Sequence, residues 1–346
     1  MIFFVAITLS CCMSVNHNDS VSDDIKLNND KIAPVKFLIK GISFVATEMK
    51  VNNSNIQPIK DINANWISLM PYAYSPWGQE VGCELAYNSD FQWRGEKDEG
   101  IIEAIILAHQ NGLKVMVKPH LWLNGNYTGD FVLSNEKDWA IWEKNYANYI
   151  LHFAHVSDSL KAEMFCIGTE LKLTISNRPV FWNKLIDSIK TFYEGELTYA
   201  ANWDDYQDVP FWAQLDYIGI NGYFPLSKNT SPTIKELSKA WQPTISAIEN
   251  FQNKIKKPIL FTEIGYKSVN SCAEEPWNPV SNNCNMLEQA NATEAFFKCY
   301  DNMPWFVGCF IWKWYPDHDN SGGKNDDDYT PQNKPTADLI RKYFKN

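Results

Sequence analysis

The sequence predicts a single-domain (β/α)8 barrel, the fold class also called a TIM barrel, over residues 36–346. Eight short apolar runs alternate with helical patterns along the chain, and this alternation is typical of a parallel sheet covered by helices. No shift in composition marks a second domain, and a chain of 346 residues fits one α/β barrel. Eight strands favour a closed barrel over a doubly wound sheet, and no GxGxxG or P-loop pattern follows any strand.

The predicted strands are short, nearly continuous apolar runs, which are typical of parallel strands buried on both faces. In chain order they are Phe37–Ala46, Trp66–Tyr72, Lys114–Leu121, Met164–Gly168, Leu197–Ala201, Tyr217–Gly222, Ile259–Thr262 and Gly308–Trp312.

Helical patterns separate these strands and close the chain. One of them ends at Gly112, a good C-terminal stop, and two others begin with a proline, which the first helical turn accommodates. The predicted helices are Gly100–Asn111, Glu136–His155, Pro179–Tyr193, Ile234–Asn253, Met286–Asn302 and Pro335–Phe344.

The first residues read as a targeting segment rather than as part of the fold. Residues 1–12 are an apolar run too short to span a membrane as a stable helix. The run ends in Leu9-Ser-Cys-Cys12, which resembles a bacterial lipoprotein signal with acylation at Cys11 or Cys12, although no Lys or Arg precedes it. An ordinary secretory signal is the alternative. Residues 13–35, rich in Asn, Asp and Ser, are expected to form a disordered tether. We therefore expect an exported, monomeric protein of the bacterial envelope, either a cell-surface lipoprotein or a secreted protein.

The charge balance and the spacing of the cysteines and histidines argue against several classes of partner and ligand. The chain carries 31 basic and 41 acidic residues without a basic cluster, which argues against a nucleic acid partner. No CxxC or HxxxH spacing indicates a metal, and we expect no metal and no cofactor. The acidic loop Asp317–Asp328 offers oxygens for calcium, but it does not match an EF-hand and Lys324 interrupts it. Cys272 and Cys284 flank a Pro/Asn-rich loop and are expected to form a local disulfide.

Two glutamates follow strand-like runs in matching contexts. Glu170 ends the segment Glu163–Glu170, and Glu263 ends Lys257–Glu263, each directly after a threonine. An unpaired charge at such a position is costly, so packing alone does not explain it. Two carboxyls on one sheet suggest hydrolysis of a glycosidic bond, with one acid and one nucleophile. The alternative is that each glutamate is a satisfied ion-pair partner.

Aromatic and amide side chains recur where the other predicted strands end. The carboxyl ends of barrel strands form one face, so these residues should surround a pocket that stacks and hydrogen-bonds sugars. The chain has 14 Trp, 16 Tyr and 19 Phe, and the alternative for each tryptophan is ordinary core packing. The predicted substrate-binding residues are Tyr72, Trp77, His120, Trp122, Asn202, Trp203, Asn221, Tyr223 and Trp312.

From Lys40 onward the chain resembles the retaining (β/α)8 glycoside hydrolases of clan A, most closely the family-113 β-mannanases. The resemblance implies that Glu170 is the acid/base, that Glu263 is the nucleophile and that Tyr223 orients Glu263. Many clan members have Asn directly before the acid/base, whereas this chain has Thr169. The motifs that carry the resemblance are Lys118-Pro-His-Leu-Trp122, Ile167-Gly-Thr-Glu-Leu171, Phe261-Thr-Glu-Ile-Gly-Tyr266, Trp312-Lys-Trp-Tyr-Pro316 and Tyr329-Thr-Pro-Gln-Asn-Lys-Pro335.

The resemblance implies a polysaccharide or oligosaccharide substrate and an endo-β-1,4-mannanase that acts by double displacement. Two alternatives remain open at this point. One is a retaining hydrolase of another β-glycan or its oligosaccharides, and the other is a non-catalytic carbohydrate-binding surface lipoprotein. Of the two tryptophans Trp312 and Trp314, only one is expected to line the sugar site, and the resemblance assigns Trp312.

Overall fold

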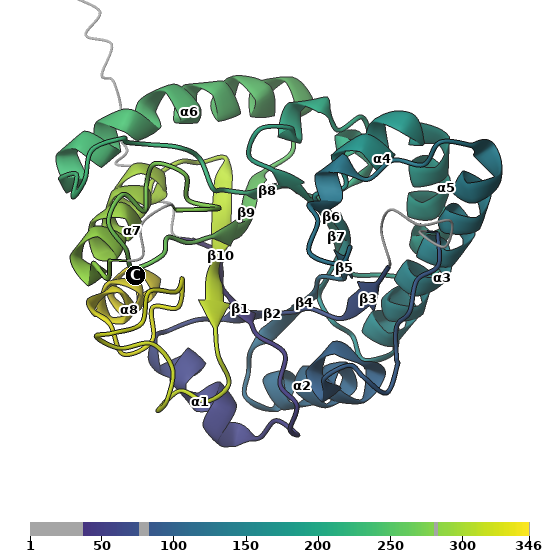
Figure 1. Ribbon diagram of the computed structural model, residues 1–346, viewed down its shortest axis with the longest axis horizontal. Coiled ribbons are helices and arrows are strands. Elements are labelled where there is room, and N and C mark those ends of the chain that lie inside the picture. Colours follow the sequence, from purple (N-terminus) through teal and green to yellow (C-terminus); the bar gives the residue numbers. More distant parts are fainter. Residues whose placement is uncertain (1–36, 76–82, 280–282, 346) are drawn as a thin grey trace, which may run out of the picture. The chain divides into compact units, whose positions relative to one another are not determined.

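Eight parallel strands close into a barrel, with helices around it (Figure 1). The computed structural model describes residues 37–75, 83–279 and 283–345. The predicted signal segment, the tether, Cys11, Cys12 and Trp77 all lie outside these described residues. Around the barrel the strands follow the order β1 (Ile39–Phe44), β10 (Phe306–Trp314), β9 (Ile259–Ile264), β8 (Ile218–Asn221), β7 (Glu196–Asn202), β6 (Met164–Thr169), β4 (Lys114–Val117) and β2 (Trp66–Leu69).

The predicted (β/α)8 barrel is therefore confirmed, although four predicted strands are shorter than expected, and two of these, β2 and β4, end just before a proline. The strand pairing of the barrel stops after Leu69 in β2 and after Val117 in β4. Each of these two segments then continues through a proline, Pro71 or Pro119. Proline has no backbone N–H to donate to a ladder. Pairing resumes beyond both prolines, where β3 (Tyr72–Tyr74) and β5 (His120–Trp122) form a separate two-stranded parallel sheet.

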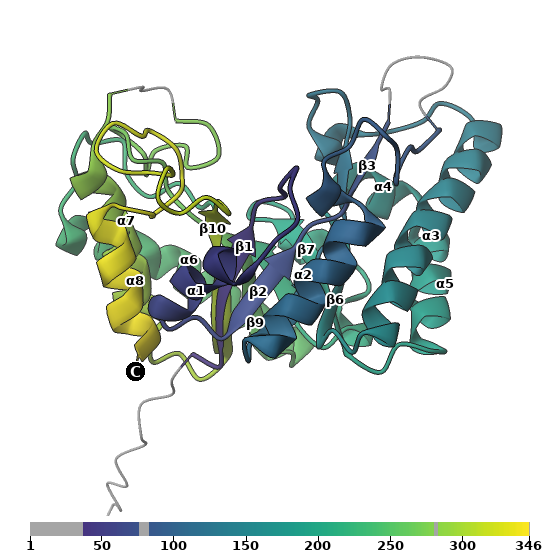
Figure 2. The same ribbon diagram turned by 90° about the horizontal axis from the view of Figure 1, so that it is seen from below.

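The helices of the described chain lie outside the strands, and Figure 2 shows the longer loops gathered at one end of the barrel. All six predicted helices are present, and two short helices, α1 and α4, were missed. A proline inside α1 and the six-residue length of α4 weaken their sequence patterns. The helices are α1 (Asn53–Asp61), α2 (Asp98–Gln110), α3 (Glu136–Ser159), α4 (Lys172–Asn177), α5 (Pro179–Lys190), α6 (Ile234–Ile255), α7 (Met286–Tyr300) and α8 (Pro335–Lys345). No helix among the described residues is long and apolar enough to cross a membrane.

The apolar core has two parts. A small cluster fills the barrel, where Trp66 meets Phe310 edge to face with ring centroids 6.3 Å apart. A larger cluster lies between the strands and the helices and includes most of the buried aromatic residues. Cys166 and Cys309 are fully buried, as expected for core thiols. The barrel is thus a packed core that holds the ends of its strands at fixed positions.

The predicted disulfide is wrong, because Cys272 and Cys284 are both free thiols in the described chain. Cys272 is fully buried, and its backbone N–H donates to the Glu288 carboxylate at 3.0 Å. Cys284 is exposed and forms an antiparallel bridge opposite Val269 instead. The backbone pairing therefore aligns Cys284 with a residue three positions before Cys272.

Close packing of strands predicts a strong effect of one added methyl group. A Cβ at Gly219 would lie 2.2 Å from the Tyr199 carbonyl oxygen on the neighbouring strand β7. Gly219→Ala must separate the two strands, so it should destabilise the fold by at least about 1–3 kcal/mol. Gly112→Ala is the comparison, because Gly112 has open space but a φ of +75°. Thermal melting followed by circular dichroism should show the larger loss for Gly219→Ala. A larger loss for Gly112→Ala would contradict the packing argument.

Candidate active site

The two glutamates lie at the carboxyl ends of two strands and face one cavity. Glu170 directly follows β6, and Glu263 is the second-last residue of β9. The cavity has a volume of about 630 Å³. It is lined by Tyr127, Glu170, Asn202, Trp203, Asp204, Tyr223, Glu263, Trp277, Trp312 and Tyr329.

Glu263 is held by donors on both carboxylate oxygens. The Lys118 ammonium, which is fully buried, pairs with Oε1, and the Tyr223 hydroxyl donates to Oε2 at 2.7 Å. A buried carboxylate needs this combination of counter-charge and hydrogen bonds to offset its desolvation. The predicted contact from Tyr223 is present. Lys118 was missed, although a lysine at the end of a buried apolar strand was a usable signal.

Glu170 has a different environment. Its Oε1 accepts a hydrogen bond from the Asn221 amide at 2.9 Å, and the Asn221 oxygen in turn accepts from Thr262 at 2.9 Å. Burial and, next, the negative charge of Glu263 raise the pKa of Glu170 to about 7. Near neutral pH the Glu170 carboxyl therefore keeps its proton in a large share of the molecules. The two carboxyls of the cavity are suited to different tasks.

His120 lies beside Glu263 as a neutral imidazole. Its Nε2 is 3.9 Å from Glu263 Oε1 and has no hydrogen-bond partner among the described residues. Burial, followed by the charge of Lys118, moves the pKa of His120 well below its usual range. The ring stacks on Trp312 with centroids 6.2 Å apart and planes 11° apart. Within the described chain, His120 Nε2 is thus a buried nitrogen without a partner beside Glu263, and His120 is not among the residues that line the cavity.

The two tryptophans of β10 face different surroundings. Trp312 lines the cavity, whereas Trp314 is fully buried and stacks on His318. In a regular strand, side chains two residues apart point to the same face. Here the register of β10 against β1 shifts between Ile311 and Trp314, so β10 is not a regular strand at this point, and the Trp312–Lys313 peptide bond is cis.

The other predicted residues divide into two groups. Asn202 and Trp203 line the cavity with the glutamates, and Trp203 stacks on Trp277 at 5.1 Å. Tyr72 and Trp122 instead line a second cavity beyond Trp312. Tyr127, Trp277 and Tyr329 were missed because they lie in loops, where no strand pattern indicates their direction.

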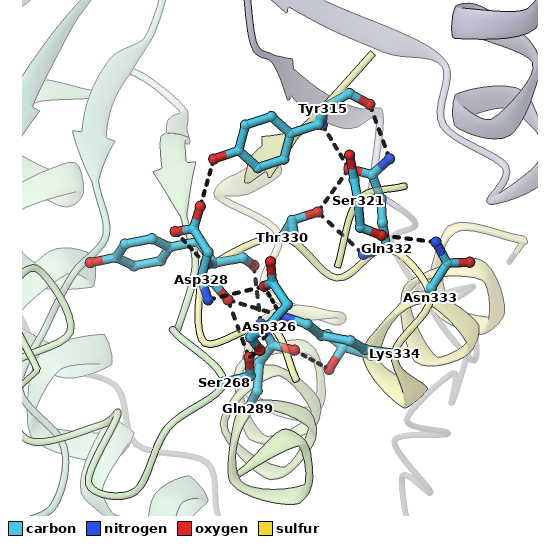
Figure 3. A network of polar contacts seen from close by, with 12 residues as sticks. Ser268, Gln289, Tyr315, Ser321, Asp326, Asp328, Thr330, Gln332, Asn333 and Lys334 are labelled. Carbon is cyan, nitrogen blue, oxygen red and sulfur yellow. Dashed lines mark hydrogen bonds and ion pairs between the residues drawn. The ribbon is translucent and has the colours of Figure 1, made fainter. Parts of the chain in front are cut away.

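A polar network holds the loop between β10 and α8 (Figure 3), and this loop carries Tyr329. The buried Lys334 ammonium donates to Ser268 Oγ and Asp326 Oδ1, each at 2.7 Å, and to the Asp328 carbonyl at 3.0 Å. The Gln289 amide donates to the Tyr329 carbonyl at 3.0 Å. These contacts fix the loop that forms one wall of the cavity.

The same network accounts for part of the acidic loop considered above for calcium. Asp326 pairs with Lys334 at 2.7 Å, and Asp328 pairs with Lys313 at 3.2 Å. The Asp328 carboxylate also accepts from the Tyr315 hydroxyl at 2.6 Å. Across the described ranges, no group of three or more His, Cys, Asp or Glu side chains is arranged to hold a metal ion.

A closed (β/α)8 barrel with paired carboxyls at the carboxyl ends of its strands defines the class of protein as a glycoside hydrolase. The chain belongs to Glycoside Hydrolase Family 113, whose model matches residues 46–334.

Solved structures agree with this fold. A family-113 β-1,4-mannanase in a complex superposes with a TM-score of 0.76 at 23% identity, covering 90% of this chain and 100% of the other. The family-113 β-mannanase AaManA from Alicyclobacillus acidocaldarius, in complex with ManMIm, gives 0.76 at 24% identity, covering 90% and 98%. A β-glucuronidase from Ruminococcus gnavus gives 0.58 at 11% identity, covering 90% of this chain and 50% of the other. No curated protein matches the sequence.

The raised pKa of Glu170 predicts a pH-dependent stability. In the unfolded chain this carboxyl ionises near 4.5, whereas in the fold it keeps its proton up to about 7. Between these values the folded state binds more protons, so this group lowers stability as the pH rises through that window. Glu170→Gln removes the titration, and the variant should gain stability relative to wild type on going from pH 5 to pH 8.

Urea unfolding at both pH values measures this difference. Glu194→Gln, at a surface glutamate whose side chain is 84% exposed, is the matched control. An unchanged difference between Glu170→Gln and wild type at pH 5 and pH 8 would contradict the buried, proton-retaining Glu170.

Proposed function

We propose that this chain is a retaining endo-β-1,4-mannanase in which Glu170 is the acid/base and Glu263 is the nucleophile. The observation that supports this most strongly is the contrast between the two carboxyls of one cavity. Lys118 and Tyr223 hold Glu263 as an oriented carboxylate, while the pKa of Glu170 is about 7. Retaining glycosidases need this pair of environments. Family membership and the likeness to β-mannanases support the choice of mannan.

In the first step, Glu170 gives its proton to the glycosidic oxygen while Glu263 attacks the anomeric carbon. The bond to the leaving sugar breaks, and a covalent glycosyl-enzyme forms on Glu263. In the second step, ionised Glu170 takes a proton from water, whose oxygen attacks the same carbon and releases Glu263. The configuration is inverted twice and so retained. The Tyr223 hydroxyl donates a hydrogen bond to Oε2 and so holds the Glu263 carboxylate in place during both steps.

In many clan members the Asn directly before the acid/base contacts the sugar 2-hydroxyl, and in this chain Thr169 holds that position. The Thr169 hydroxyl lies 3.4 Å from the Pro119 carbonyl oxygen and is directed into the protein. His120 Nε2 is a buried atom 3.9 Å from Glu263 Oε1, and it has no partner within the described chain. Because the nucleophile attacks the carbon next to the 2-hydroxyl, a group beside Glu263 is well placed for this contact. We assign it to His120.

A retaining hydrolase of another β-glycan would use the same machinery, so the substrate needs a direct test. Release of reducing sugar from mannan, glucomannan, cellulose and xylan should be fastest on mannan. A faster rate on cellulose or xylan would move the assignment to that polymer. No hydrolysis of any of the four, with carbohydrate binding retained, would favour a non-catalytic binding protein.

Export remains part of this proposal, with acylation at Cys11 or Cys12 and a monomeric enzyme outside the cytoplasm. Mass spectrometry of the protein from its native membrane fraction should find a lipid on one of these cysteines. A soluble product cleaved at another position would instead indicate an ordinary secretory signal.

The two glutamates should respond differently to removal. Glu263→Ala should abolish turnover on every substrate, since no covalent intermediate can form. Glu170→Ala should lose far less activity on aryl mannosides with good leaving groups, which need little protonation, than on mannan. Steady-state rates on both substrates, with Glu194→Ala as the surface control, measure the contrast. Equal losses for Glu170→Ala on both substrates would contradict its role as the acid.

Substitution of the two tryptophans of β10 should have different effects, one on activity and the other on thermal stability. Trp312→Ala should lower kcat/KM about ten- to a hundredfold, because an aromatic floor of the sugar site is lost. Trp314→Ala should act mainly on the melting temperature, because a fully buried indole is replaced by a cavity. Kinetics and thermal melting on both variants decide the matter. The assignment fails if Trp314→Ala loses the activity in a folded protein and Trp312→Ala does not.

A further inference from the structure

Glu170 has a backbone conformation that residues with a side chain rarely adopt. Its φ is +53°, in the left-handed region, which is unfavourable for any residue with a Cβ and is usually left to glycine. Among the described residues that line the cavity of the two glutamates, Glu170 is the only one in this region. Such a conformation persists only where the surrounding structure fixes it, and it often marks a functional site.

Strand β7 binds two successive N–H groups at this point of the chain. The Glu170 N–H donates to the Ala200 carbonyl at 2.8 Å, and the Leu171 N–H donates to the Tyr199 hydroxyl at 2.6 Å. The second of these bonds is buried, so loss of the hydroxyl would leave a costly unpaired donor. A backbone carbonyl and a side chain of β7 therefore each hold one of the two peptide units that flank the Glu170 Cα.

The Tyr199 hydroxyl is itself held in place. Its side chain is 1% exposed, and its ring centroid lies 6.0 Å from that of Trp182 and 5.7 Å from that of Phe211. Burial, followed by the charge of Asp205, raises the pKa of Tyr199 well above its usual range. The group therefore stays a neutral hydroxyl at a fixed position.

A second hydroxyl binds the same peptide unit from a different loop. Thr128 Oγ1 donates to the Glu170 carbonyl oxygen at 3.2 Å. Tyr199 and Thr128 thus hold the N–H and the C=O of the peptide between Glu170 and Leu171, while Ala200 holds the peptide before it. With both flanking peptides bound, the backbone of Glu170 has no freedom to return to a negative φ.

This backbone conformation determines where the Glu170 carboxyl lies. The torsion φ sets the direction of the Cα–Cβ bond relative to the preceding strand, here β6. In the left-handed conformation the carboxyl lines the cavity and accepts from the Asn221 amide at 2.9 Å. A negative φ would turn the Cβ away from this direction. The position of the carboxyl therefore depends on Tyr199 and Thr128, which are not among the residues that line the cavity.

We propose that Tyr199 and Thr128 are positioning residues for Glu170, whose hydroxyls hold its backbone in the left-handed conformation that directs the carboxyl toward the glycosidic oxygen. The inference rests on the proposed function, because it takes Glu170 as the acid/base. Neither residue touches the sugar in this account, so loss of either hydroxyl should impair proton transfer to the leaving group.

The test compares kcat/KM on a substrate that needs the acid with kcat/KM on one that does not. Mannotetraose has a poor leaving group, whereas a dinitrophenyl β-mannobioside releases its phenol with little protonation. Tyr199→Phe keeps the ring and should lower kcat/KM about tenfold on mannotetraose but less than about threefold on the dinitrophenyl substrate. Thr128→Val should lower kcat/KM on mannotetraose about threefold and leave the dinitrophenyl substrate nearly unaffected. Thr128→Ser keeps a hydroxyl and should retain the wild-type values.

Tyr193→Phe is the matched control. Tyr193 is also a buried tyrosine with a backbone partner, because its hydroxyl donates to the Ala162 carbonyl at 2.7 Å, before the start of β6. This variant should keep the wild-type ratio of the two kcat/KM values. Equal losses on both substrates, or no loss, in folded Tyr199→Phe and Thr128→Val would overturn the positioning role.

A second measurement tests the backbone of Glu170 directly. Glycine in place of alanine usually lowers stability, but at a left-handed position the order reverses. Glu170→Gly should therefore melt at a higher temperature than Glu170→Ala. A lower melting temperature for Glu170→Gly would overturn the inference.

These failures are distinct from failure of the proposed function. If wild type cleaves cello-oligosaccharides and not manno-oligosaccharides, mannan is wrong, and the same comparison on the cello series decides the positioning role. If wild type cleaves neither series, both proposals are overturned.

Discussion

The buried ion pair between Lys118 and Glu263 is the interaction on which the rest of the candidate site depends. Lys118 is fully buried and Glu263 is 5% exposed, so each charge needs the other to offset the loss of water. Lys118 also lies 5.4 Å from the centroid of the Trp312 ring, over its face. One ammonium thus holds the carboxylate and contacts the tryptophan that separates the two cavities. Removing it would leave an uncompensated carboxylate, which typically costs about 3–5 kcal/mol.

Barrel geometry explains how such a pair forms from residues 145 positions apart in sequence. Lys118 follows β4, and Glu263 lies in β9, at the same end of the barrel. The second carboxyl, Glu170, is connected to this arrangement by Asn221 of β8 and Thr262 of β9. Because Asn221 contacts Glu170 while its neighbour in β9 is Glu263, the two carboxyls are coupled through adjacent strands rather than through flexible loops. The different environments of the two carboxyls therefore follow from the fold.

Sequence was informative where a strand directs the side chain. The apolar runs predicted the eight strands, and the strand ends indicated Glu170, Glu263 and Tyr223, since the carboxyl ends of a parallel barrel meet on one face. It was uninformative where loops decide the contact. Tyr329 reaches the cavity only because Lys334 and Gln289 fix its loop, and such long-range contacts leave no local pattern.

The wrong disulfide shows where local patterns fail. Loop spacing suggested a disulfide between Cys272 and Cys284, but backbone pairing places Cys284 opposite Val269. Alternation along β10 likewise does not reveal the register shift between Ile311 and Trp314, where Trp312 lines the cavity and Trp314 is buried. Pairing between strands and loops is a tertiary property, which a single stretch of sequence does not contain.

The central claim is that Glu263 forms a covalent bond to the sugar. In a 2-deoxy-2-fluoro-mannosyl fluoride, the fluorine at C2 slows both formation and hydrolysis of the glycosyl-enzyme. Incubation with this reagent should therefore trap the glycosyl-enzyme. Peptide mass spectrometry of the trapped protein tests the claim most directly. The account predicts one added fluorosugar on the peptide that contains Glu263, lost again on addition of an acceptor sugar. A label on Glu170, or turnover of the reagent with inverted product and no label, would contradict it.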